Sequence, residues 1–316
     1  MSTGFHHDAA HFQVIVPIDF SNRDNFMTID EPQNQAFQLQ SIVNPPVIRI
    51  EPSQSWFSLK LCELSEYREL LYFLAWRDVK VRYKQTVIGV GWAVLQPVIT
   101  MIVFTAIFGR FAQIPSDGLP YPLFSFSALI PWTYFSTALN RSIASVVAES
   151  HLISKVYFPR LILPLASTLA GIVDFSISLI VLLGMMVWYG VGISWWLLTL
   201  PAFLLFALLT ALAAGLWLSA LNVRYHDVGH AVPFLVQIWM FCSPIVYPVS
   251  LVPERYRLLY SLNPMVGVIE GFRWALLNTA SPNFSVMTVS AVVVLIILTG
   301  GLIFFKNMER TFADVV

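Results

Sequence analysis

Few residues of this sequence have the types and spacing that chemistry needs, and each candidate lacks part of a site. No Gly-Lys-Ser or Gly-Lys-Thr occurs, so the chain has no phosphate-binding loop of its own. His226 and His230 are spaced i, i+4 beside Asp227, but no third ligand is evident, and we predict no metal site. Cys62 and Cys242 lie in different parts of the chain, so we expect no structural disulfide.

Asp174 is the one charged residue in the stretch 161–223. An ionisable residue inside a membrane-spanning helix is costly, and such a residue is by default a functional candidate. A transport role would call for a partner cation in the hydrocarbon, and the sequence shows none there. A structural role as a hydrogen-bonding group is the other interpretation, and the sequence leaves both open.

Aromatic and amide side chains form two groups that suit sugar binding. Trp92 and Gln96 share a face of one expected helix, and a second stripe is formed by Gln237, Phe241 and Tyr247. Aromatic rings stack on sugar rings, and amides hydrogen-bond to hydroxyls, so these five residues are candidates for the lining of a glycan path. Contact with lipid or packing between helices explains the same pattern equally well.

The elements that position these residues follow from the composition. Hydrophobic residues make up 57% and charged residues 11% of the 316 residues, whereas about 25% of the residues of soluble proteins are charged. The 18 basic and 18 acidic side chains cancel, so no net charge attracts nucleic acid. We therefore predict an all-α integral membrane protein that has no nucleic-acid partner.

The uncharged stretches are long enough to cross a membrane. A helix of about 20 apolar residues spans the roughly 30 Å hydrocarbon layer. Backbone groups in lipid must be hydrogen-bonded within their own segment, and long apolar runs favour helices over the short alternating strands of a β-barrel. We expect six transmembrane helices, near residues 87–109, 121–140, 161–189, 195–221, 231–249 and 285–305.

Lysine and arginine are unevenly divided between the two expected membrane faces. Twelve of them flank the side on which the first span begins, and four flank the opposite side. Since cytoplasmic flanks carry the excess of positive charge, we predict that both termini are cytoplasmic. No basic-then-apolar leader opens the sequence, so we expect no cleaved signal peptide.

Segments outside the expected spans differ in character. Residues 1–59 are acidic and contain several prolines, and we expect a cytoplasmic extension that is partly disordered or docked elsewhere. Residues 60–84 combine apolar and charged positions in a pattern typical of an amphipathic helix on the membrane surface. Residues 141–160 form a cytoplasmic loop with helical potential. Two short helices are expected on the outer side, near 254–262 and 265–278.

Six motifs, in this order, resemble the membrane subunits of ABC exporters for lipid-linked polysaccharides, which are the permeases for O-antigen, capsule and teichoic acid. The resemblance covers about residues 60–316 and excludes 1–59. Its motifs are Trp76-Arg77-Asp78-Val79-Lys80-Val81-Arg82-Tyr83-Lys84-Gln85-Thr86-Val87-Ile88-Gly89 with Trp92-Ala93-Val94-Leu95-Gln96-Pro97, Lys155-Val156-Tyr157-Phe158-Pro159-Arg160, Asn222-Val223-Arg224-Tyr225-His226-Asp227-Val228, Ser243-Pro244-Ile245-Val246-Tyr247-Pro248, Leu262-Asn263-Pro264-Met265 and Phe312-Ala313-Asp314-Val315-Val316.

The resemblance implies a homodimer of six-span subunits, with residues 85–316 as the permease domain, joined to two cytosolic ATP-binding subunits. These partners would use ATP and Mg²⁺, while this chain holds no cofactor. The substrate would be an undecaprenyl-linked polysaccharide, first of all O-antigen, which crosses the bacterial inner membrane into the periplasm for lipopolysaccharide biosynthesis. Residues 60–84 would form the interface helix, 145–158 the coupling helix, and the helices near 254–278 a periplasmic gate.

The resemblance also gives individual residues a role. Channel-lining residues would be Trp92, Gln96, Gln237, Phe241 and Tyr247. Residues that couple the chain to the ATPase would be Arg77, Arg82, Glu149, His151, Lys155 and Arg160. Residues of the periplasmic gate would be Glu254, Asn263, Pro264, Glu270 and Arg273. Asp174 is a candidate from its position in the expected third span alone, as an intramembrane polar residue of either role.

Other functions stay open at this stage. Within the exporter class, these motifs do not separate O-antigen from teichoic acid or capsule, and they favour all three over a smaller lipid or drug. A membrane enzyme acting on polyprenyl-linked glycans would need clustered charged residues at one face, and the outer loop 250–284 offers few. A secondary carrier or channel would need intramembrane ionisable pairs, and in the sequence Asp174 stands alone.

Overall fold

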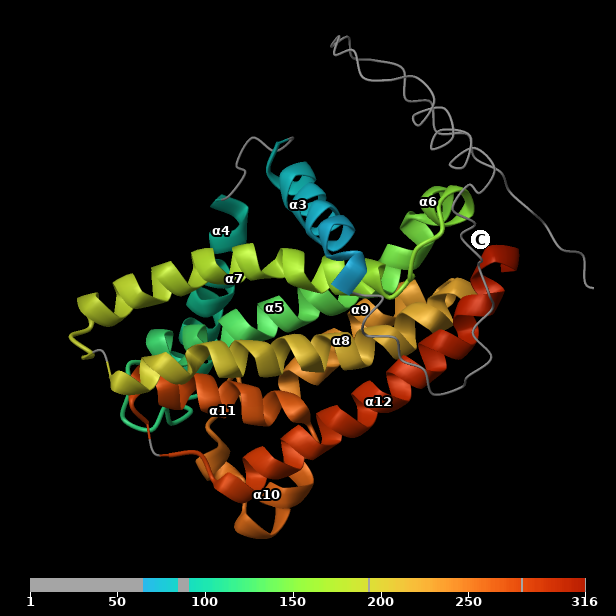
Figure 1. The fold of residues 1–316 in the computed structure, drawn as a ribbon. Coiled ribbons are helices and arrows are strands. Elements are labelled where there is room, and N and C mark those ends of the chain that lie inside the picture. The colour runs from blue at the N-terminus through green and yellow to red at the C-terminus, as the bar shows by residue number, and fades with distance from the viewer. Residues whose placement is uncertain (1–64, 85–90, 193, 280, 316) are drawn as a thin grey trace, which may run out of the picture. The chain divides into compact units, whose positions relative to one another are not determined.

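The computed structural model describes residues 65–84, 91–192, 194–279 and 281–315, and all regular elements in these ranges are helical (Figure 1). The predicted extension 1–59 and residues 60–64 of the predicted interface helix lie outside the described residues. The helices are α3 (Arg68–Lys84), α4 (Gly91–Phe104), α5 (Tyr121–Ala148), α6 (Ser150–Lys155), α7 (Ile162–Trp188), α8 (Leu200–Arg224), α9 (Asp227–Phe241), α10 (Glu254–Tyr260), α11 (Pro264–Leu277) and α12 (Phe284–Val315), together with the π-helix η1 (Thr105–Phe111) and the 3₁₀ turns η2 (Trp195–Thr199) and η3 (Val249–Leu251).

Four helical segments of the described chain are long and apolar enough to cross a membrane. They correspond to the first, third, fourth and sixth expected spans. The fifth expected span, 231–249, is shorter than predicted, since α9 has 15 residues and the chain turns after Phe241. The second expected span coincides with α5, which has 28 residues but contains many serine, threonine and tyrosine residues. The four segments are Gly91–Phe111, Ile162–Trp188, Trp195–Arg224 and Phe284–Glu309.

Helix α5 lies at the centre of the described bundle. It packs against α7 and α8, and also against α4, α9 and α11 (Figure 1). Phe124, Phe126 and Phe135 on α5 are almost completely buried. The Phe135 ring meets the Trp239 ring of α9 edge to face, with centroids 5.1 Å apart. Because protein surrounds α5 on most sides, its polar residues cost less than they would against lipid.

The first span changes its helical type before it reaches the loop 112–120. After Phe104 the α-helix continues as the π-helix η1, whose wider turns end at Phe111. Gly109 in η1 approaches the start of α5, where a β-carbon would lie 2.8 Å from Tyr121 Cγ. Glycine at this position lets the two helices pass in close contact.

A second apolar cluster lies at the end of the bundle where α3, α6 and α12 meet. It joins Leu74 of α3, Ile153 of α6 and Phe158 of the following loop to Phe305 and Phe312 of α12. The Phe305 and Phe312 rings meet edge to face at 5.3 Å between centroids. This cluster holds the segment predicted as a coupling helix against the last span.

Candidate functional site

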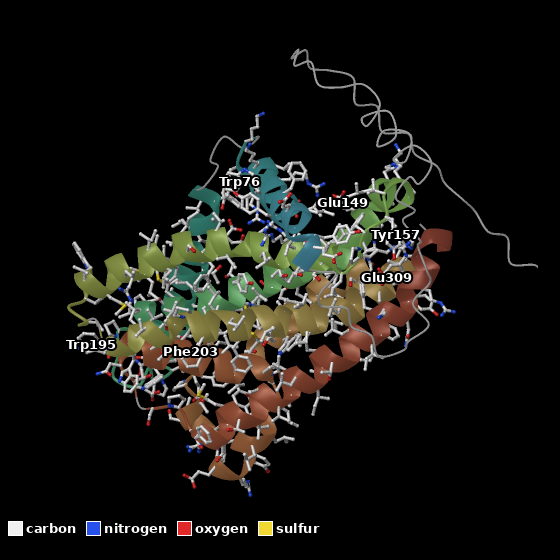
Figure 2. The ribbon with its side chains drawn as sticks, in the orientation of Figure 1. Trp76, Glu149, Tyr157, Trp195, Phe203 and Glu309 are labelled. Atoms are coloured by element: carbon white, nitrogen blue, oxygen red, sulfur yellow. The ribbon has the colours of Figure 1, made fainter. Side chains whose placement is uncertain are left out.

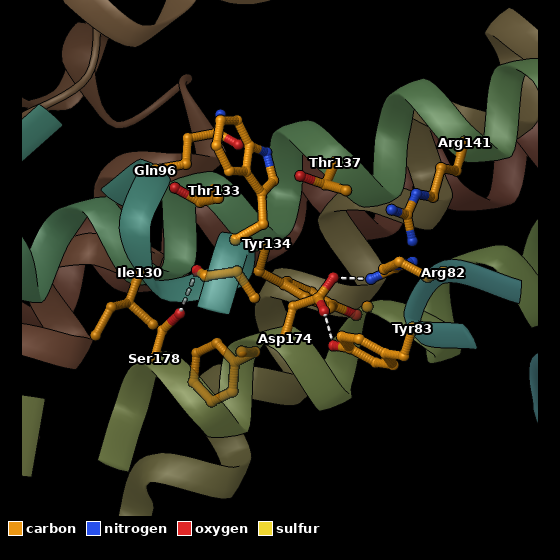
Figure 3. Close-up of a pocket in the computed structure, with 14 residues that line it drawn as sticks. Arg82, Tyr83, Gln96, Ile130, Thr133, Tyr134, Thr137, Arg141, Asp174 and Ser178 are labelled. Carbon is orange, nitrogen blue, oxygen red and sulfur yellow. Dashed lines mark hydrogen bonds and ion pairs between the residues drawn. The ribbon is translucent and has the colours of Figure 1, made fainter. Parts of the chain in front are cut away.

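A cavity of about 480 Å³ lies between α3, α4, α5 and α7 (Figure 3). It combines arginine and carboxylate groups, hydroxyls, an amide and aromatic rings, which is the mixture typical of ligand sites. Its lining residues are Arg82, Tyr83, Trp92, Ala93, Gln96, Ile130, Thr133, Tyr134, Thr137, Arg141, Gly171, Asp174, Phe175 and Ser178.

Asp174 anchors the end of α3 to α7. Its carboxylate forms an ion pair with Arg82 and accepts a hydrogen bond from the Tyr83 hydroxyl (Figure 3). Burial raises the pKa of Tyr83 and lowers that of Arg82, so the phenol stays protonated as a donor while the guanidinium benefits from a nearby carboxylate. The expectation that Asp174 stands alone was wrong, because its cation comes from the interface helix and not from another span.

Helix α7 also holds the start of the first span. The Ser178 hydroxyl, one turn after Asp174, donates to the Ala93 carbonyl of α4 at 3.3 Å. The two predicted channel residues of α4, Trp92 and Gln96, both line the cavity (Figure 3). Helix α7 therefore fixes both sides of the connection between the interface helix and the first span.

A second cavity, of about 520 Å³, lies between α3, α5 and α7 and shares Arg82 and Arg141 with the first. On its wall the Arg77 guanidinium donates to the carboxylate of Glu149 at 2.5 Å and to that of Asp78 at 3.0 Å. The hydrogen bond to Glu149 raises the pKa of Arg77. Two of the predicted coupling residues, Arg77 and Glu149, thus bond to each other.

The predicted coupling segment 145–158 divides between the last turn of α5 and the short helix α6. His151 and Lys155 of α6 are exposed, as is Tyr157 in the following loop, whose side chain is 76% exposed (Figure 2). Exposed groups of this kind are available to a partner. The Glu149 carboxylate accepts from Arg77 of α3, so it is less available to a partner than His151 and Lys155.

Arg160 connects the same loop to the end of α12. Its backbone N–H donates to the Glu309 carboxylate at 3.0 Å, and its guanidinium donates to the Glu309 carbonyl. The guanidinium carbon also lies 5.8 Å from the centroid of the buried Phe312 ring. Arg160 therefore makes its contacts within the chain.

The residues predicted for the gate lie on or beside α10 and α11, where both short helices form as expected. Asn263 caps α11 by accepting from the Met265 N–H at 3.1 Å, and Pro264 occupies the first turn. The same amide oxygen accepts from the Trp239 indole at 2.9 Å, while the amide nitrogen donates to the Ser243 hydroxyl at 3.0 Å. Asn263 thus joins the end of α9 to the start of α11.

Arg273 is buried in the same region. It donates to the backbone carbonyls of Phe124 and Ile245, at 3.4 and 3.0 Å, and its guanidinium carbon lies 3.6 Å from the Phe124 ring centroid. No ion pair joins it to Glu270, one turn before it, although the i, i+3 spacing permits one.

Glu254, at the start of α10, is exposed and lies 3.7 Å from Arg257.

The three other predicted channel residues lie along α9 and the turn after it. Gln237 and Phe241 are exposed on α9. Tyr247 lies beyond the end of the helix, where its hydroxyl is 3.0 Å from the Tyr260 hydroxyl of α10. The structure therefore places the candidates in two groups, Trp92 with Gln96 and Gln237 with Phe241, and leaves Tyr247 off the predicted stripe.

Sequence reasoning missed most of the lining of the first cavity, including the polar residues Tyr83, Thr133, Thr137, Arg141 and Ser178. Tyr83 and Arg141 lie among the basic and aromatic residues that the sequence places near one membrane face, but nothing in the sequence distinguishes these two from their neighbours. Ser178 had no signal beyond its spacing from Asp174. Among the described residues, no group of three histidine, cysteine or acidic side chains is placed to hold a metal ion.

Comparison with known proteins gives one consistent result. A family model described as ABC-2 type transporter matches residues 69–277. The O-antigen export system permease protein RfbA of Myxococcus xanthus is 29% identical over 255 residues, which cover 80% of this chain and 97% of the relative. A protein of the same name from Klebsiella pneumoniae is 26% identical, over 78% of this chain and 95% of its own length. The polysialic acid transport protein KpsM of Escherichia coli is 25% identical, over 74% and 91% respectively.

Proposed function

Because the chain belongs to the ABC-2 type transporter family, we infer that it is the membrane subunit of an ATP-driven polysaccharide exporter in the bacterial inner membrane. ATP hydrolysis belongs to a separate subunit, in keeping with the missing phosphate loop here. The observation that carries the proposal is the match to permeases named for O-antigen export, which extends over 97% of one relative. We take O-antigen as the first choice, and capsule as the next because of the polysialic acid transport relative.

Several finer features of the proposal come from the resemblance. The polysaccharide is carried on undecaprenyl, moves from cytoplasm to periplasm, and passes through a channel between two copies of this chain, each with an ATP-binding subunit that uses ATP and Mg²⁺. Teichoic acid and smaller lipids or drugs are the remaining alternatives. The family match and the permease relatives favour this proposal over a membrane enzyme.

We assign the second and fifth spans of a six-span layout to α5 and α9. Helix α5 has 28 residues, enough for about 42 Å at 1.5 Å per residue, which exceeds the hydrocarbon thickness. Helix α9 has 15 residues and reaches about 22 Å, so the turn after it must lie within the membrane, covered by α10 and α11. Six spans place both termini on one side, and the excess of lysine and arginine there assigns that side to the cytoplasm, which reporters fused to either end would test.

The exposed faces of α4 and α9 support the channel assignment. Trp92 of α4 is 57% exposed, Phe241 of α9 is 50% exposed, and Gln237 is exposed about one turn before Phe241. Between two copies of the chain, rings and amides of this kind would let a sugar polymer slide, because stacking tolerates changes of register. The helices α10 and α11 would close the outer end of that path as a gate.

Motion of the ATPase would enter through α6 and reach α3 through the Arg77–Glu149 bond. Glu149→Arg breaks this bond and places two cations together, so we expect export to fall at least about fivefold while the ATPase activity of the partner persists. The double variant R77E/E149R restores an ion pair and should recover export. Asp227→Arg, the same charge reversal at an exposed acid of α9, is the matched control. Normal export by Glu149→Arg would contradict this route.

Deletion of the gene tests the function as a whole. We expect the lipid-linked glycan to accumulate inside the cell and to be lost from the surface, with recovery on complementation. Chemical identification of the accumulated glycolipid separates O-antigen, capsule and teichoic acid. Normal surface glycan in the deletion strain would refute the proposal.

A further inference from the structure

The first cavity lies at the level of the lipid headgroups. The first span, Gly91–Phe111, has 21 residues and rises about 30 Å, the thickness of the hydrocarbon layer, so Gly91 marks one membrane boundary. The bond from Ser178 to Ala93 places that part of α7 at the same level, and Asp174 is one turn nearer the water. A ligand of this cavity is therefore bound where headgroups and acyl esters lie.

One wall of the cavity is a polar stripe on α5. Thr133, Thr137 and Arg141 recur every four residues and so face the same side of the helix (Figure 3). Gln96 of α4 lines the same cavity. The side chains of these four residues have no hydrogen bond or ion pair with the described part of the chain. The wall thus presents donors that are available to a ligand.

Net charge does not by itself call for an anion here, since three arginines and three carboxylates line the two cavities. The pairing does. Arg77 is bonded to both Asp78 and Glu149, and Asp174 is occupied by Arg82. Arg141, directed toward the same space as Arg82 (Figure 3), is left without a carboxylate of its own. A guanidinium without a carboxylate partner among the described residues favours a bound anion in a partly buried space of this kind.

We propose that this cavity binds the phosphate and ester region of an anionic glycerophospholipid. Arg141 would bind the phosphodiester, and Thr137, about 6 Å deeper along α5, would donate to an acyl ester carbonyl. Ile130 and Phe175 then meet the start of the acyl chains. The descending order of cation, hydroxyl and apolar group matches a phospholipid and not a polyprenyl pyrophosphate, which has no ester carbonyl. A cavity of about 480 Å³ holds this part of the lipid, while the tails remain in the bilayer.

Native mass spectrometry of the full-length chain, titrated with phosphatidylglycerol or phosphatidylcholine in detergent, tests the proposal. Phosphatidylglycerol should bind more tightly, and Arg141→Gln should weaken its binding about tenfold or more. Thr137→Val, which keeps the charge and the shape, should weaken binding about threefold. Arg224→Gln, the same change at an exposed arginine on the same side, should leave binding unchanged.

Three results would overturn the proposal. One is equal binding of the two phospholipids, and another is wild-type binding by both Arg141→Gln and Thr137→Val. The third is displacement of phosphatidylglycerol by a polyprenyl pyrophosphate at lower concentration, which would assign the cavity to the transported lipid. Thr137→Val keeps the test decisive if Arg141→Gln fails to fold. None of these readouts depends on export, so they stand apart from the test of the proposed function.

Discussion

Replacement of Asp174 distinguishes a structural role of this residue from a role in transport, since the sequence leaves both open. In Asp174→Asn the amide keeps an acceptor for the Tyr83 hydroxyl but loses the charge opposite Arg82. If the residue is structural, the variant loses stability and recovers when the partner changes with it. If the residue carries a proton or an ion during transport, no partner exchange restores export.

The size of the effect follows from the geometry. The Arg82 and Asp174 side chains are 18% and 23% exposed, so the pair is more buried than a surface ion pair but not fully desolvated. A hydrogen bond to a charged group contributes about 1.5–3 kcal/mol. We expect a coupling energy of about 2 kcal/mol between the two residues, and a fall of the unfolding midpoint by about 4–8 °C.

A double-mutant cycle with thermal unfolding in detergent measures this coupling. It compares the wild type with Asp174→Asn, Arg82→Gln and the double variant, and the exchange R82D/D174R should recover most of the lost stability. Ser176→Ala, an exposed position on the same helix whose hydroxyl bonds only to its own backbone, is the control and should change little. A coupling energy near zero, or an export defect in Asp174→Asn without any loss of stability, would refute the structural role.

Two further predictions concern the gate region. Gly271→Ala places a β-carbon against the Phe203 ring and should cost about 1–3 kcal/mol, whereas Gly184→Ala on α7 meets open space and should stabilise by about 1 kcal/mol; thermal unfolding of both variants checks this contrast. Asn263→Ala removes the cap of α11 and the acceptor of Trp239, and should cost about 2 kcal/mol, while Asn263→Asp keeps both acceptor bonds and should cost less.

Helix positions were largely predictable because the hydropathy pattern agrees with the residues that mark helix starts and ends. The starts of α5, α8 and α11 coincide with prolines in their first turns, and α11 ends at Asn278 in a left-handed conformation. The same signals failed after Phe241, where an apolar run continues through Pro244 although the helix has ended. Apolar composition alone does not tell a spanning helix from a buried turn.

The composition of the cavity was much harder to predict than the helices. Asp174 and Arg82 are 92 positions apart, and the side on which α3 packs decides whether they meet. Periodicity places residues on a face of their own helix but does not select the neighbouring helix. For that reason Trp92 and Gln96 were grouped correctly, while the partner of Asp174 was not found.

Three arginines of the predicted cytoplasmic face were proposed as coupling residues for an ATPase, and all three bond within the chain. Arg77 joins α3 to the end of α5, Arg82 joins α3 to α7, and Arg160 joins the coupling loop to α12. Hydrogen bonds and ion pairs of charged groups are directional, so at the ends of these helices they fix each helix against its neighbour. The outward contacts then fall to His151 and Lys155, which are exposed on α6. Substitution of these two should weaken partner binding, whereas substitution of the arginines should weaken the transmission of its motion.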